Sequence, residues 1–236
     1  MLGKLFGFGP KPAALVKTTI LSTTYRLQNT TWKAFVATAS PALQELAAST
    51  GAPGPQLIVQ MVSEHEGASF LFLPAGSAAK AASVVHGVPS YASVVEPCLL
   101  PGSIETSTVE GYTWQWAAAA PGCTPVTVTR TSFDIKEGAF EDFVKQFGNS
   151  SAQMRGPAEE VGLLSQATFP SAGGKVTLLS SFTPGADGPK RMGPKLPELW
   201  KEMGLLKFLT AQPQIDTSEH GSWLAPVDSA GLSVGA

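Results

Sequence analysis

Charged residues, cysteines and long apolar runs are all scarce in this sequence. Asp, Glu, Lys and Arg make up 14% of the 236 residues and leave a net charge of −2, and no stretch gathers Lys or Arg as a nucleic-acid surface does. The two cysteines, Cys98 and Cys123, are too few for a disulfide scaffold. No apolar run reaches the ~20 residues of a membrane span. We therefore expect a cytoplasmic protein that binds no nucleic acid and does not cross a membrane.

The motifs of several enzyme classes are also missing. The chain has no G-x-S-x-G, no G-x-x-x-x-G-K-[ST] and no G-x-G-x-x-G after a strand, which excludes the usual hydrolase, nucleotide-hydrolase and dinucleotide-binding sites. The three histidines, His65, His86 and His220, do not have the spacing of a ligand set. We therefore expect neither a metal site nor a cofactor.

What the sequence does contain is one pattern that occurs twice. In each copy a strand rich in β-branched residues leads into a helix that opens with two aromatic residues three positions apart, Trp32 and Phe35 or Phe140 and Phe143; this spacing puts both rings on one helix face. A two-stranded hairpin, a second helix and an extended segment follow. The predicted strands are 16–27, 57–63, 67–74 and 96–105, then 126–135, 163–169, 174–184 and 214–224. The predicted second helices are 77–95 and 196–210.

The order β-α-β-β-α-β in each copy predicts an α+β fold made of two tandem ferredoxin-like units. Two helices cover one face of each four-stranded sheet, so the other face needs a partner, which the second sheet provides. We expect an intramolecular dimeric α+β barrel. The predicted parts are an N-terminal arm (1–15), repeat 1 (16–105), a linker with an aromatic strand (106–124), repeat 2 (125–227) and a C-terminal tail (228–236).

A short stretch on the second helix of the first copy resembles a known superfamily. The order Val85-His86-Gly87-Val88-Pro89-Ser90-Tyr91 is similar to the His, small or Pro, then aromatic order of the dimeric α+β barrel proteins, which include the antibiotic-biosynthesis-monooxygenase-like and stress-responsive A/B barrel families. The second copy departs from it, because its second helix has no histidine. The resemblance, which spans about residues 16 to 227, implies monooxygenase or cyclase chemistry without a cofactor, or haem binding through His86.

Two stretches offer apolar surface to other proteins. One is the N-terminal arm, and the other is an extended segment in which aromatic side chains alternate and so share one side. That segment either closes the end of the barrel or forms an anchor patch for a partner. The candidate interaction residues are Leu5, Phe6, Phe8, Tyr112, Trp114 and Trp116.

These features support two functional hypotheses. The preferred one is a non-catalytic structural protein that binds neighbouring subunits in a large eukaryotic assembly such as a ciliary axoneme, because its sparsely charged surface fits burial among partners. The alternative is a cofactor-independent monooxygenase or cyclase that acts on a small apolar substrate, or a haem-binding relative. In that case His86 is the base. The candidate pocket residues are Tyr25, Trp32, Gln60 and Gln166, with a glutamine as donor to a developing oxyanion.

Overall fold

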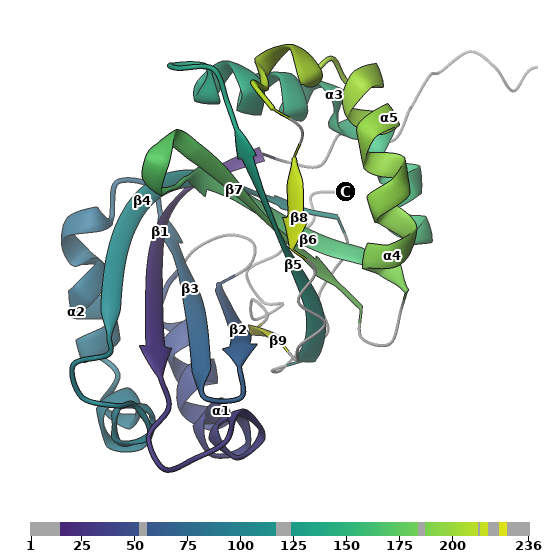
Figure 1. Cartoon of the computed structure of the whole chain (residues 1–236). Helices are drawn as coiled ribbons and strands as arrows, with labels where there is room; N and C mark the ends of the chain where they lie inside the picture. The colour runs from purple at the N-terminus through teal and green to yellow at the C-terminus, as the bar shows by residue number, and fades with distance from the viewer. Residues whose placement is uncertain are drawn as a thin grey trace, which may run out of the picture.

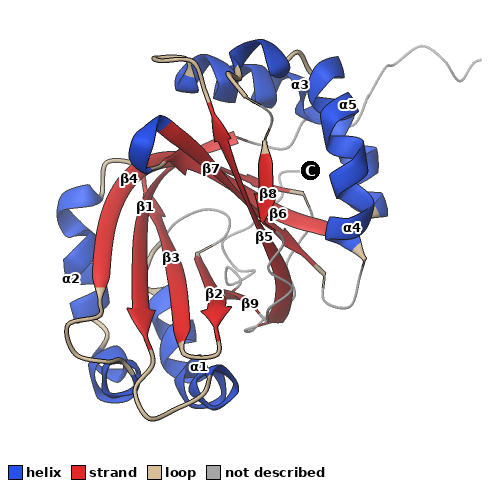
Figure 2. Ribbon diagram, viewed as in Figure 1, coloured by secondary structure: helices blue, strands red, loops and turns tan. Residues whose placement is uncertain are grey.

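The computed structural model describes residues 15–51, 56–116, 124–183, 187–211, 213–216 and 222–225. Two helix-covered sheets face each other and join along their edges (Figure 1). The helices lie outside the sheets, and the strands surround a common interior (Figure 2).

The first half of the chain contains the predicted order of elements. Its strands and helices are β1 (Leu15–Arg26), α1 (Trp32–Ala48), β2 (Leu57–Ser63), β3 (Glu66–Pro74), η1 (Ala78–Lys80), α2 (Ala81–His86), the π turn η2 (Tyr91–Val95), η3 (Glu96–Cys98) and β4 (Glu105–Gln115). The side chain of Thr31 caps α1, which buries Trp32 and Phe35 against the sheet as their spacing predicts.

The second half repeats this order. Its elements are β5 (Thr124–Asp134), α3 (Phe140–Glu160), β6 (Leu163–Pro170), η4 (Ala172–Gly174), β7 (Lys175–Phe182), α4 (Gly188–Met192), η5 (Gly193–Lys195), α5 (Leu196–Glu202), η6 (Leu206–Phe208), β8 (Gln214–Asp216) and β9 (Ser222–Ala225). The helix α3 continues through Gly148, where the missing side chain leaves room for Leu15.

The strand pairings confirm the predicted fold class. The first half has the order β4-β1-β3-β2, and in the second half β8 and β9 pair with β5, which pairs with β7, which pairs with β6. In each half the order is therefore fourth, first, third, second. The pairs β4–β6 and β2–β9 then join the halves into one closed antiparallel ring. The shared order agrees with a duplication, which stays a prediction, as do the domain boundaries.

Three apolar clusters fill this architecture. One lies between the first sheet and α1, and a second lies between the second sheet, α3 and α5. The third fills the barrel where the inner faces meet: Ile20, Ile58, Ala68, Phe70, Phe72, Val126, Val128, Ala167, Phe169 and Leu179. The second sheet thus covers the face that the first sheet alone would leave open.

Two predicted elements differ from the structure. The segment 96–105 is not extended: it begins with the short helix η3, which has Pro97 in its first turn, and the last strand starts at Glu105. The aromatic strand placed in the linker is therefore β4, a central strand between β1 and β6. The predicted second helix of the first half, 77–95, is broken into short pieces around Gly87 and Pro89, as expected for these two residue types.

Candidate functional site

A cavity of about 170 Å³ lies beneath α2, between the helices and the first sheet. Its apolar lining is Leu21, Leu43, Leu46, Leu57, Leu71, Ala82, Val85 and Ile104, and its polar lining is Thr23, Ser69, His86, Tyr91, Glu96 and Thr106. Apolar walls with a few polar groups are typical of small-molecule sites. The volume is close to the ~150 Å³ that holds one benzene ring in an engineered protein core.

His86 lies at the mouth of this cavity. It is the last residue of α2, its side chain is exposed, and it also lines the cavity. Gly87 follows as the cap of the helix, and its N–H donates to the carbonyl of Ser83 at 2.9 Å. An imidazole in this place can take a proton from a bound molecule and pass it to water.

Tyr91 and Glu96 line the same cavity. Burial, and then the charge of Glu96, raise the pKa of Tyr91 to about 12. The phenol is therefore neutral at physiological pH and can donate a hydrogen bond. Sequence reasoning gave neither residue a role, although both follow His86 within ten positions and Tyr91 belongs to the stretch that carried the family resemblance.

Three hydroxyl side chains form a row along one side of the cavity. Thr23 on β1 is paired with Ser69 on β3 and with Thr106 on β4, and all three line the cavity. Adjacent strands lie ~4.8 Å apart, so the row offers hydroxyls at that interval. The site therefore combines an apolar floor, a row of hydroxyls and three titratable side chains.

The predicted aromatic pocket residues lie beside the cavity and not in its wall. Tyr25 and Trp32 are buried in the core under α1, with ring centroids 5.9 Å and 5.7 Å from Phe35. Burial, and then the neighbouring Tyr91, raise the pKa of Tyr25. Tyr91 packs against the same apolar cluster that contains Tyr25.

The two predicted glutamines lie on opposite faces of their sheets. Gln60 lies two residues after Ile58 on the same strand, so it shares the face of Ile58, which is the barrel interior. Gln166 faces the helices, where it accepts a hydrogen bond from Trp116 Nε1 at 3.1 Å and donates one to Ser180 Oγ at 3.0 Å. Gln166 lines a separate cavity of about 20 Å³ in the second half. Neither glutamine lines the cavity of His86.

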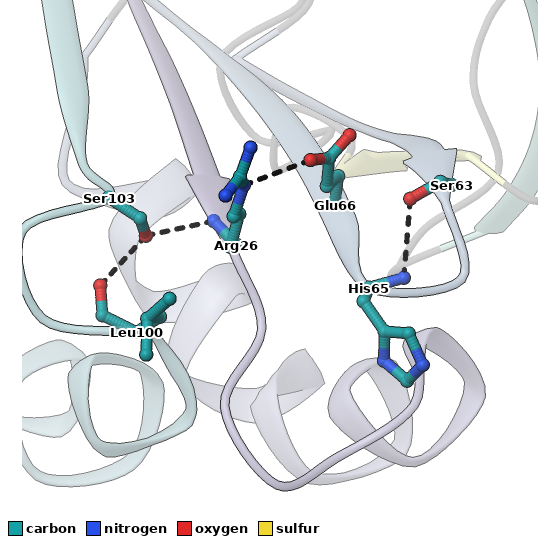
Figure 3. A network of polar contacts seen from close by, with 6 residues as sticks. All are labelled: Arg26, Ser63, His65, Glu66, Leu100 and Ser103. Carbon is teal, nitrogen blue, oxygen red and sulfur yellow. Dashed lines mark hydrogen bonds and ion pairs between the residues drawn. The ribbon is translucent and has the colours of Figure 1, made fainter.

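His65 belongs to a surface network at the far end of β1. Figure 3 shows its imidazole pointing away from the ion pair between Arg26 Nε and Glu66 Oε1, which is 3.0 Å long. The backbone N–H of Arg26 donates to Ser103 Oγ at 3.0 Å. These exposed contacts fasten the β2–β3 turn and the loop before β4 to the end of β1.

The aromatic row of β4 packs inside the protein. Trp114 is 1% exposed, with its ring centroid 4.5 Å from that of Phe147 on α3, and Tyr112 packs on Phe140. Trp114 therefore has no free surface for another protein. The other candidate interaction residues, Leu5, Phe6 and Phe8, lie outside the described residues, as does Cys123.

The described residues lack two further kinds of feature. No group of three or more His, Cys, Asp or Glu side chains in this part of the chain is arranged to hold a metal ion. No helix described here is long and apolar enough to span a bilayer.

Comparison with solved structures shows the fold of this chain. No family model and no curated protein matches the sequence. A structure of a candidate monooxygenase from Lactobacillus acidophilus NCFM aligns with a TM-score of 0.55 at 10% identity, over 88% of this chain and 93% of its own. One from Fusobacterium nucleatum subsp. nucleatum ATCC 25586 aligns with a TM-score of 0.54 at 10% identity, over 89% and 93%. The chain has the dimeric α+β barrel fold.

The comparison with these two structures corrects the preferred functional hypothesis. Both solved structures are described as candidate monooxygenases, so the expectation of a non-catalytic assembly protein, with its ciliary setting, is wrong. At 10% identity the likeness shows the fold alone.

Haem, which the fold resemblance raised, does not fit the cavity of His86. Pockets for drug-sized ligands measure ~300–1,000 Å³, whereas this cavity measures about 170 Å³. A porphyrin is too large for the space beneath α2.

Proposed function

We propose that this chain is a cofactor-independent monooxygenase that oxidises a small, mostly apolar aromatic molecule in the cavity beneath α2. The observation that carries the proposal is that His86, Tyr91 and Glu96 line one cavity whose floor is otherwise leucine-rich. Titratable groups gathered in an apolar cleft are a feature of active sites.

The proposed reaction begins with a proton transfer. His86 takes a proton from an activated C–H or O–H group of the substrate. The resulting electron-rich anion reduces dioxygen. For an activated methylene the balance is R₂CH₂ + O₂ → R₂C=O + H₂O: one oxygen atom forms the new carbonyl and the other leaves as water. Dioxygen is the oxidant, so the four electrons come from the substrate alone.

Tyr91 stabilises the charge that this step creates. Because its pKa is raised to about 12, its phenol keeps its proton and can donate to a substrate oxygen on which negative charge accumulates. Thr23, Ser69 and Thr106 supply further hydroxyls to hold polar substituents of the ring. The exposed side chain of His86 returns the proton to water.

Oxygen isotopes test this proposal. The purified chain is incubated with ¹⁸O₂ and a panel of monocyclic phenols and activated arylmethylenes, and oxygen uptake and product mass are measured. We expect uptake with at least one compound and one ¹⁸O atom in its product. The absence of uptake across the panel, or a product whose new oxygen comes from water, would contradict the proposal.

A further inference from the structure

The second half contains a larger cavity at the place that corresponds to the cavity of His86. An isolated bridge joins Leu27 to Leu99 in the first half and Ile135 to Leu209 in the second. Each bridge directly follows a short helix, η3 or η6. Glu96, which opens η3, therefore corresponds to Leu206, which opens η6.

This second cavity has a volume of about 390 Å³, within the ~300–1,000 Å³ range of small-molecule sites. It is lined by Thr131, Leu196, Pro197, Trp200, Leu206, Leu209, Thr210, Ala211 and Pro213. None of these described lining residues is ionisable. Where the first half offers acid and base groups, the second offers leucine, proline and tryptophan.

Thr131 indicates what such a cavity would bind. The residue is 3% exposed, it lines this cavity and the adjoining one of about 20 Å³, and no hydrogen bond joins its hydroxyl to the described residues. Buried hydroxyls are normally paired, because leaving one without a partner is costly. At the rim, Leu206 is an apolar side chain left 40% exposed.

We propose that the second half binds a neutral, largely apolar small molecule whose single hydrogen-bonding group pairs with Thr131. Its apolar body lies against Trp200 and Leu209 and covers Leu206. A charged ligand is disfavoured, because no charged lining residue is described there and a buried charge needs a partner. The site is independent of the proposed chemistry, since none of its described lining residues is an acid or a base that could perform it.

The test uses 1-adamantanol, a rigid neutral alcohol that is too bulky for the 170 Å³ cavity and has no acidic C–H for His86. Binding to the full chain is followed by isothermal titration calorimetry. We expect saturable 1:1 binding, which Thr131→Val weakens about five- to tenfold, the loss of one hydrogen bond. We expect Leu206→Glu to weaken it more than tenfold.

Two controls keep the test decisive. Leu100→Glu alters a leucine of the first half that is also 40% exposed, and it should leave the affinity unchanged. His86→Gln should also leave it unchanged, so a failure here is separate from a failure of the proposed enzyme activity. No saturable binding, or equal binding by Leu206→Glu, would overturn the site; equal binding by a folded Thr131→Val would overturn the role of Thr131.

Discussion

Gly67 lies opposite Tyr25 in the pairing of β3 with β1, and the ring of Tyr25 occupies the space that a side chain at position 67 would need. A Cβ there would lie 2.7 Å from Tyr25 Cε2 and 2.7 Å from Trp32 Cζ3. The glycine therefore lets both rings pack over β3 and against Phe35. Both rings belong to the apolar cluster against which Tyr91, a residue of the cavity lining, also packs.

Gly67→Ala should destabilise the protein by about 1–3 kcal/mol, because the added methyl group overpacks a closed core. Chemical denaturation measures the change in the free energy of unfolding. The control is Gly156→Ala in α3, where a Cβ would meet nothing within 4 Å; alanine there should be neutral or stabilise by about 0.5–1 kcal/mol. Equal stability of Gly67→Ala and the wild type would show that Tyr25 and Trp32 are not packed as described.

All three tyrosines of the chain should resist ionisation in the folded state. Burial is the largest cause in each case: the pKa of Tyr91 and that of Tyr112 rise to about 12, and that of Tyr25 rises further. In an ultraviolet titration the native protein should show little tyrosinate at pH 10.5, and the denatured chain should show most of it.

The same pKa shifts predict alkaline destabilisation. Between about pH 9 and 12 the unfolded chain loses tyrosine protons that the folded chain retains, so the free energy of unfolding falls as the pH rises through this window. Below about pH 9 the three phenols are neutral in both states and contribute no slope. A native tyrosinate signal with a midpoint near pH 10 for all three residues would refute the burial.

Gln166→Ala should destabilise the protein by about 1–3 kcal/mol, since it removes the partner of Trp116 Nε1 and of Ser180 Oγ and opens a gap in a buried layer. Thermal unfolding followed by circular dichroism reports the loss. Gln153→Ala, at an exposed position of α3, is the matched control and should stay within about 0.5 kcal/mol of the wild type. Similar melting curves for the two variants would contradict this role of Gln166.

The strands and the barrel could be predicted from the sequence because their signals are local and repeated. The β-branched strands, the aromatic pairs that open α1 and α3, and the two hairpins all lie within a few residues of the expected places. The last strand of the first half was misplaced, because Glu96 to Cys98 form a turn of helix that the sequence does not distinguish from an extended segment. The strand β4 also pairs with β6, and this contact between distant parts of the chain leaves no local signal in the sequence.

The candidate site was only partly predictable, because strand register decides which side chains meet. The similar stretches that contain Gln60 and Gln166 suggested equivalent positions, yet Gln60 pairs with Ala68 and Gln166 with Ser180, and the two side chains face opposite sides. His86 was found from its neighbours in sequence. Thr23, Ser69 and Thr106 come from three strands, so only the folded sheet brings them together.

A comparison of two histidine variants tests the central claim most directly. His86→Gln removes the proposed base from the cavity, and His65→Gln changes an exposed histidine in the β2–β3 turn. With the substrate found in the oxygen-uptake panel, we predict that His86→Gln loses at least about 100-fold in rate and that His65→Gln keeps the wild-type rate. Wild-type oxygen uptake by a folded His86→Gln variant would contradict the assignment of His86 as the base.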